Sequence, residues 1–242
     1  MTQETPNQEN ELWFLRHGRA GIENEYDALS EEGFCQANAF GQYCQEMQIE
    51  FDSVYAGSLR RQQETATTVT DRLPNFMPEQ IITNQSLNEF SPHHVVRVIS
   101  KLRETNTEIR AIVDEWMLKW NESVDAGKPM FHKIMEYFLE AWVDEPGDQG
   151  FDSWANSVIE GFSQLPNQGR VLVVSSATPI AIASGIAFGM SPKQSLQLAE
   201  PIFNSSLTIV KRRQPGYSRN GLEPIMFNAI PHLRDAKLVT LL

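Results

Sequence analysis

Polar and cationic residues follow three strand-like segments of the chain, and their types suit anion chemistry. Arg16 and His17 come directly after the apolar run 12–15. Arg61 follows the second such segment, and Ser176 follows the third. An arginine guanidinium can hold a phosphate through two hydrogen bonds, and a neutral histidine can act as a nucleophile. The sequence therefore predicts a site that holds an anion beside a candidate nucleophile.

Each of these residues also has an ordinary structural interpretation. Arg60 and Arg61 stand in the first turn of a predicted helix, where the helix dipole disfavours cations. A bound anion would offset that cost, whereas a solvated helix end is the simpler interpretation of either arginine alone. A single His17 is likewise more often a surface or hydrogen-bonded residue. The joint position of these residues at strand ends favours the anion site.

The strand ends belong to a predicted sheet whose strands alternate with helices. Strands are predicted at 12–15, 53–56, 81–82, 170–175, 207–211 and 225–229. Helices are predicted near 30–47, 59–73 and 152–165, and another begins after Thr178, with Ser30 and Thr178 as N-caps and Pro179 at the first helical position. In open α/β sheets, ligands bind at the carboxyl ends of the strands. The pattern predicts a three-layer α/β/α sandwich with a mostly parallel central sheet.

Residues 92–145 differ in character, because almost all of them follow a helical pattern. Three apolar stripes predict three amphipathic helices, with breaks near Thr105 and between Ala126 and Pro129. We interpret the aromatic residues of these stripes as core packing rather than as a ligand site. We expect a helical insert over the carboxyl ends of the strands, within a single domain of residues 1–242 whose residues 1–10 form a disordered tail.

The composition excludes several classes of partner. The 242 residues include 20 Lys+Arg and 31 Asp+Glu, which gives a formal net charge of −11. An acidic surface argues against general binding to nucleic acid or to an anionic membrane. The first residues lack a secretory signal and the apolar stretch 180–190 is too short to span a bilayer, so we expect a cytoplasmic protein. No cluster has metal-ligand spacing, and we expect no metal or other cofactor.

Five segments, in order along the chain, resemble the motifs of the histidine phosphatase superfamily, which is also called phosphoglycerate mutase-like. The hallmark Arg-His-Gly is matched by Arg16-His17-Gly18. The Leu-Thr-x-x-Gly-x-x-Gln-Ala motif is similar to residues 29–37, and Ser-Pro-Leu-x-Arg-x-x-Gln-Thr-Ala is similar to residues 57–66, which aligns Arg61 with the second phosphate-binding arginine. A Leu-x-Glu segment corresponds to residues 87–89, and the closing elements resemble residues 204–206 and 232–233.

This resemblance implies a metal-independent phosphomonoester hydrolase that forms a phosphohistidine on His17. Arg16 and Arg61 would hold the phosphoryl group, and their charges would keep His17 neutral. Glu89 is the implied general acid, with a solvated loop carboxylate as the alternative interpretation. The implied partner is a small phosphorylated substrate or a phosphate anion.

The main departure from the family pattern lies after the strand at 170–175. The family carries Ser-His-Gly there, whereas this chain has Ser175-Ser176-Ala177, so that Ser176 replaces the second catalytic histidine. A serine hydroxyl donates a neutral hydrogen bond, about half as strong as a charge-assisted one. We expect turnover reduced by roughly a hundred- to a thousandfold, by analogy with the loss of an oxyanion-hole donor. A pseudoenzyme that binds a phospho-ligand without turnover is the alternative.

A second departure follows the nucleophile directly. Many family members carry Thr or Ser three residues after the histidine and Asn six residues after it, where this chain has Ala20 and Glu23. This difference disfavours phosphoglycerate mutase activity relative to phosphatase activity.

Overall fold

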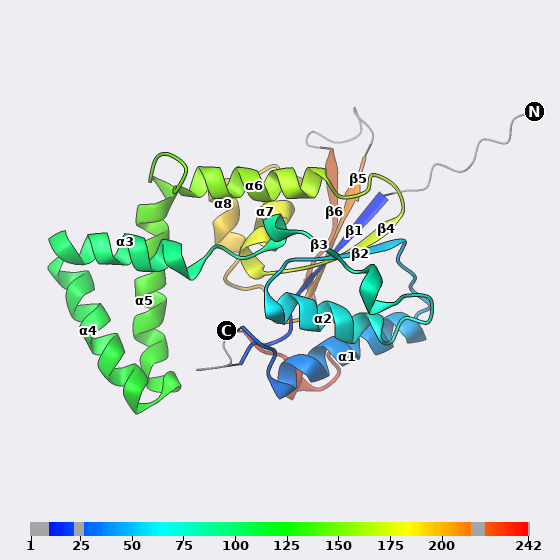
Figure 1. Cartoon of the computed structure of the whole chain (residues 1–242), viewed down its shortest axis with the longest axis horizontal. Coiled ribbons are helices and arrows are strands. Elements are labelled where there is room, and N and C mark those ends of the chain that lie inside the picture. The colour runs from blue at the N-terminus through cyan, green and yellow to red at the C-terminus, as the bar shows by residue number, and fades with distance from the viewer. Residues whose placement is uncertain (1–9, 22–26, 214–220, 242) are drawn as a thin grey trace, which may run out of the picture. The chain divides into compact units, whose positions relative to one another are not determined.

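The computed structural model describes residues 10–21, 27–213 and 221–241 (Figure 1). The chain forms two compact units, one made of Met1–Glu89 with Ser157–Leu242 and the other of Phe90–Asn156. Of the tail expected at 1–10, only Asn10 lies within the described residues, and it is a buried residue of the first strand, not part of a tail. The single-domain organisation stays a prediction.

The first unit contains a six-stranded sheet with the strand order β3-β2-β4-β1-β5-β6. Its strands are β1 (Asn10–Arg16), β2 (Ser53–Ala56), β3 (Ile82–Thr83), β4 (Arg170–Ser175), β5 (Leu207–Arg212) and β6 (Leu222–Ala229). Strand β4 pairs in parallel with β1 and β2, and β2 also pairs in parallel with β3. Strand β5 is antiparallel to β1 and to β6. The predicted mostly parallel sheet is therefore confirmed.

Helices cover both faces of this sheet. Figure 1 shows α1 (Glu31–Glu46) and α2 (Arg60–Thr70) on one side, and α7 (Ala177–Ala187) with the short α8 (Pro192–Ser195) on the other. Side chains of a strand alternate between its faces. Trp13 and Leu15 accordingly join the core with Phe40 of α1. Strand β1 is buried on both faces, which explains why its sequence is a continuous apolar run.

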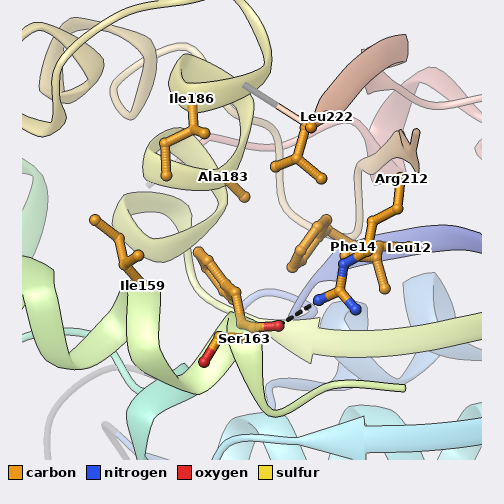
Figure 2. Close-up of a pocket in the computed structure, with 10 residues that line it drawn as sticks. Leu12, Phe14, Ile159, Ser163, Ala183, Ile186, Arg212 and Leu222 are labelled. Carbon is orange, nitrogen blue, oxygen red and sulfur yellow. Dashed lines mark hydrogen bonds between the residues drawn. The ribbon is translucent and has the colours of Figure 1, made fainter. Parts of the chain in front are cut away.

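The opposite face of β1 packs against α7 and the end of α6 (Phe151–Ser163). Phe14 contacts Phe162 of α6 with ring centroids 5.3 Å apart. A cavity of about 230 Å³ lies in this layer. Figure 2 shows the side chains that line it, most of which are apolar. The guanidinium of Arg212 also lines the cavity and donates to the carbonyl oxygens of Leu165 and Pro166, at 3.0 and 2.8 Å. This cavity lies among the strands and helices that build the core.

The second unit consists mainly of α3 (Pro92–Thr105), α4 (Thr107–Glu122) and α5 (Val124–Val143). These helices match the three that the apolar stripes predict. The predicted break between Ala126 and Pro129 is wrong, because Ser123 caps α5 by accepting from the Ala126 N–H and the helix continues through Pro129. Trp142 is fully buried and stacks on Phe138 at 5.1 Å between ring centroids, as core packing requires.

The start of α7 differs from the prediction in a similar way. Ser176, not Thr178, is the N-cap residue, so Pro179 falls third in the helix rather than first. Proline is tolerated there because backbone N–H groups of the first turn have no partner within the helix. Within the described part of the chain, no helix is both long and apolar enough to cross a bilayer.

The loop after β1 packs backbone against backbone on the start of α1. A Cβ atom on Gly33 would lie 2.2 Å from the carbonyl oxygen of Arg19, and one on Gly18 would lie 2.4 Å from that of Gly33. Ser30 caps α1 as predicted, since its hydroxyl accepts from the Gly33 N–H at 3.1 Å. Glycine at positions 18 and 33 thus allows the loop that carries His17 to rest on the helix.

We predict that Gly33→Ala lowers the free energy of unfolding by about 2 kcal/mol, because the new methyl group meets backbone atoms that cannot move aside. At a helical position with free space around it, a glycine-to-alanine change would instead raise the free energy of unfolding by about 1 kcal/mol. Urea unfolding followed by circular dichroism measures the difference. Gln45→Ala, at an exposed position of α1, is the control and should change stability by less than about 0.5 kcal/mol. Equal stability of the Gly33→Ala protein and the wild type would contradict the close contact.

Candidate active site

The structure places the predicted site residues at the carboxyl ends of β1 and β4 and on the segments beside them. Arg16 is opposite Ser175 in the register of these strands, and the His17 N–H donates to the Ser175 carbonyl oxygen at 2.9 Å. Ser176 follows directly, and Arg61 reaches His17 from the first turn of α2. The expected meeting of three chain segments therefore occurs at this edge of the sheet.

The imidazole of His17 is held by two hydrogen bonds of opposite kinds. Nδ1 lies 2.7 Å from the carbonyl oxygen of Gly18, which can only accept. The Nε–H of Arg61 lies 3.1 Å from Nε2 and can only donate. This network assigns the proton to Nδ1 and a lone pair to Nε2. His17 is thus a neutral imidazole whose basic nitrogen faces a guanidinium.

Burial and charge both oppose protonation of His17. The residue is only 6% exposed. Burial is the largest cause that holds its pKa well below the ordinary value of 6.5, and the charges of Arg61 and Arg16 lower it further. The sequence predicted that the two arginines lower the pKa of His17. It did not predict the burial of the ring, which lowers the pKa more.

Both predicted phosphate-binding arginines are buried, and they have different partners. The guanidinium of Arg16 donates to the carbonyl oxygen of Ile202. Nη1 of Arg61 forms an ion pair with Oδ1 of Asp27 at 2.6 Å. Arg60 points its side chain to Glu64 instead, with Nε and Oε1 2.7 Å apart. Only the second of the two adjacent arginines therefore reaches the imidazole.

Asp27 belongs to the site, although the sequence did not predict it. Its Oδ2 accepts from the backbone N–H of Arg60 at 3.0 Å, while its Oδ1 binds Arg61. A guanidinium and the N–H groups at a helix N-terminus are groups that commonly hold an anion. In this structure a carboxylate of the chain itself binds them. No motif marks Asp27, and its role depends on contacts across 34 residues of sequence.

Ser176 and Glu89 lie at the start of α7. Ser176 is 1% exposed, and its Oγ accepts from Nε2 of Gln62 at 2.9 Å. Oε2 of Glu89 accepts from the backbone N–H of Thr178 at 3.2 Å. This carboxylate therefore stands at the positive end of the α7 dipole. It is a half-buried side chain with a defined partner, unlike the solvated loop carboxylate of the alternative interpretation.

Polar side chains of the motif segments hold the loop after His17. Oγ1 of Thr65 accepts from the Gly18 N–H at 3.0 Å, and Oε1 of Gln36 accepts from the Arg19 N–H at 2.8 Å. Thr65 and Gln36 thus bind the backbone of this loop. Ala20 continues this loop, whereas Glu23 lies outside the described residues.

Residues 204–206 and 232–233, which resemble the last motifs of the family, contact the same loop. The Ser205 N–H donates to the carbonyl oxygen of His17 at 3.2 Å, and Oγ of Ser205 lies 3.1 Å from Nε2 of His232. His232 packs edge-on against Phe40, with ring centroids 5.1 Å apart. Burial lowers the pKa of His232 from 6.5 to about 4. This second neutral histidine contacts Ser205, which in turn binds the backbone of His17.

Comparison with known proteins gives a consistent family and fold. The model of the histidine phosphatase superfamily (branch 1) matches residues 12–220. The fold is similar to a phosphoglycerate mutase from Bacillus anthracis str. Sterne, with a TM-score of 0.58 and 16% identity over 96% of this chain and 98% of that chain. It is also similar to the alpha-ribazole phosphatase from Shigella flexneri, with a TM-score of 0.57 and 15% identity over 90% of this chain and 96% of that chain.

A third similar structure is a phosphoserine phosphatase from Entamoeba histolytica in complex with 3-phosphoglyceric acid. Its TM-score is 0.56, with 17% identity over 93% of this chain and 99% of that chain. At such identities the likeness shows the fold alone. No curated protein matches the chain.

We predict that acid destabilises the protein partly through His232. Between pH 4 and 6.5 the unfolded chain binds a proton at this residue that the folded protein excludes, so stability rises with pH across that window. Lowering the pH from 7 to 5 should cost about 2 kcal/mol of unfolding free energy at this residue. Urea unfolding at both pH values measures the loss in the wild type and in His232→Gln, which should lose about 2 kcal/mol less. Equal losses in the two proteins would show that His232 titrates alike in the folded and unfolded states.

Proposed function

This chain belongs to the histidine phosphatase superfamily, and from that premise we propose that it is a phosphomonoester hydrolase acting through a phosphohistidine on His17. The observation that carries the proposal is the neutral, buried imidazole whose Nε2 faces Arg61. A nucleophile needs a free lone pair, and the environment of His17 retains one at neutral pH. Similar folds that are named as phosphatases and mutases agree with phosphoryl chemistry.

The proposed first step transfers the phosphoryl group to the protein. Nε2 of His17 attacks phosphorus while the bond from phosphorus to the ester oxygen breaks. Arg61 releases Nε2 and donates instead to a phosphoryl oxygen, where Arg16 supplies the second cation. Glu89 gives its proton to the leaving oxygen.

The second step regenerates the protein. A water molecule attacks the phosphohistidine, the bond from Nε2 to phosphorus breaks, and phosphate leaves. Glu89 takes the proton of the attacking water. The contact of its Oε2 with the backbone N–H of Thr178, two residues after Ser176 at the start of α7, supports this assignment.

We propose that Ser176 stands where the family's second histidine would act. Its position at the end of β4, beside the strand that leads to His17, supports this role. A hydroxyl donates a weaker hydrogen bond to the phosphoryl group than an imidazolium does, so the reaction is slow.

A phosphate-binding module without turnover is the second candidate, and the contact between Asp27 and Arg61 favours it. A carboxylate 2.6 Å from Nη1 of Arg61 competes with the incoming phosphoryl group for that cation. In such a module, Arg16 and Arg61 would hold the bound phosphate by charge without transferring it.

We predict that the wild type slowly hydrolyses p-nitrophenyl phosphate and that His17→Ala abolishes this activity, because the nucleophile is lost. Ser176→His should raise the rate by roughly a hundred- to a thousandfold, since it restores a charge-assisted donor. Phosphate release is followed alongside orthovanadate binding by calorimetry. His132→Ala, at an exposed histidine of the second unit, is the control and should leave the rate unchanged.

The hydrolase proposal would be contradicted if the wild type hydrolysed p-nitrophenyl phosphate no faster than His17→Ala does. If the wild type shows no such hydrolysis but binds orthovanadate, and Ser176→His gains turnover, the binding module is the correct function.

A further inference from the structure

Gln62, in the first turn of α2, has an amide group whose orientation is fixed by its neighbours. Its Oε1 accepts from the backbone N–H of Leu59 at 3.2 Å. Its Nε2 donates to the carbonyl oxygen of Leu87 at 3.2 Å and to Oγ of Ser176 at 2.9 Å. If the amide were turned over, an acceptor would face the Leu87 carbonyl and a donor would face the Leu59 N–H. The side chain is fully buried, so water cannot relieve such a mismatch, and the nitrogen must face Ser176.

This orientation decides what the Ser176 hydroxyl can do. Because Oγ accepts from Gln62, the hydroxyl hydrogen points away from Gln62 and is available to another acceptor. Across residues 10–21, 27–213 and 221–241, the structure shows no acceptor for that hydrogen. The hydroxyl also makes no capping bond within α7, although Ser176 is its N-cap residue. A buried donor without an acceptor is costly, which suggests that it serves a ligand.

Ser176 belongs to the same strand end as the proposed nucleophile. Ser176 directly follows Ser175, whose carbonyl oxygen accepts from the His17 N–H at 2.9 Å. A phosphoryl group on Nε2 of His17 would therefore be bound at the strand end where this donor stands.

We infer that Gln62 is a positioning residue, which fixes the Ser176 hydroxyl as a hydrogen-bond donor to a phosphoryl oxygen. The inference rests on the proposed function for the identity of that ligand. Gln62 acts through Ser176 and does not touch the phosphoryl group. The pair of neutral side chains supplies a directed donor where the family carries a histidine.

A purely structural role for Gln62 makes a different prediction. The Leu87 carbonyl oxygen also accepts from Oγ of Ser175 at 2.6 Å, so its position does not depend on Gln62 alone. If Gln62 only supported the fold, its loss would weaken anion binding equally with or without the Ser176 hydroxyl.

A double-mutant cycle on the full chain separates these roles. Orthovanadate affinity is measured by calorimetry, and kcat and KM with p-nitrophenyl phosphate, for the wild type, Gln62→Met, Ser176→Ala and the double variant. We expect Gln62→Met to weaken orthovanadate binding about five- to tenfold in the wild type and less than twofold in Ser176→Ala. The loss should appear in kcat more than in KM, because the donor acts on the phosphoryl group in transfer.

Gln63→Met is the matched control. This neighbouring glutamine donates to the Gly57 carbonyl oxygen at 2.6 Å, and its replacement should leave the orthovanadate affinity within twofold of the wild type.

Equal weakening by Gln62→Met in both backgrounds would overturn the inference. If Gln62→Met does not fold, as thermal unfolding would show, Gln62→Glu replaces it, because it keeps the shape and the acceptor for Leu59. Its charge repels orthovanadate in both backgrounds, and its second carboxylate oxygen would accept the Ser176 hydroxyl hydrogen, so the extra loss in the presence of Ser176 still measures the positioning role. Orthovanadate binding without turnover would defeat the hydrolase proposal alone, and the cycle of affinities would still decide the role of Gln62.

Discussion

The burial of the His17 imidazole between a carbonyl oxygen and a guanidinium is the interaction on which the site depends. Gly18 accepts from Nδ1 and Arg61 donates to Nε2, so the ring fits only when it is neutral. A protonated ring would oppose the guanidinium of Arg61 without solvent to screen the two charges. The contact between glycines 18 and 33 and the bonds from Thr65 hold the loop that makes this arrangement possible.

Features that depend on local sequence were predicted well. Strand β4 has the predicted bounds. Its sequence is a continuous apolar run, rich in valine, that follows a glycine, and this pattern is typical of a central parallel strand. The cap at Ser30 needed only residues within one turn. The cap of α7 was misplaced because Ser176 and Thr178 are both suitable caps, and proline fits anywhere in a first turn.

Partners of the candidate site could not be predicted in this way. Asp27 and Gln62 carry no motif signal, and their partners lie 34 and 114 residues away in sequence. The fold alone brings them to Arg61 and Ser176. The net charge of −11 argues against polyanion partners, but it did not indicate that the carboxylate of Asp27 would bind Arg61. The chain thus combines two buried arginines beside His17 with a net negative charge.

The protonation state of His17 tests the account most directly. Two-bond ¹H–¹⁵N correlation spectra of the histidine rings, recorded from pH 8 to pH 5.5 and assigned by loss of signals in His17→Ala, report which nitrogen carries the proton. Because burial, Arg61 and Arg16 hold the pKa of His17 well below 6.5, its ring should remain neutral throughout, with the proton on Nδ1. A ring that becomes protonated near pH 6.5, or one that carries its proton on Nε2, would contradict the central claim.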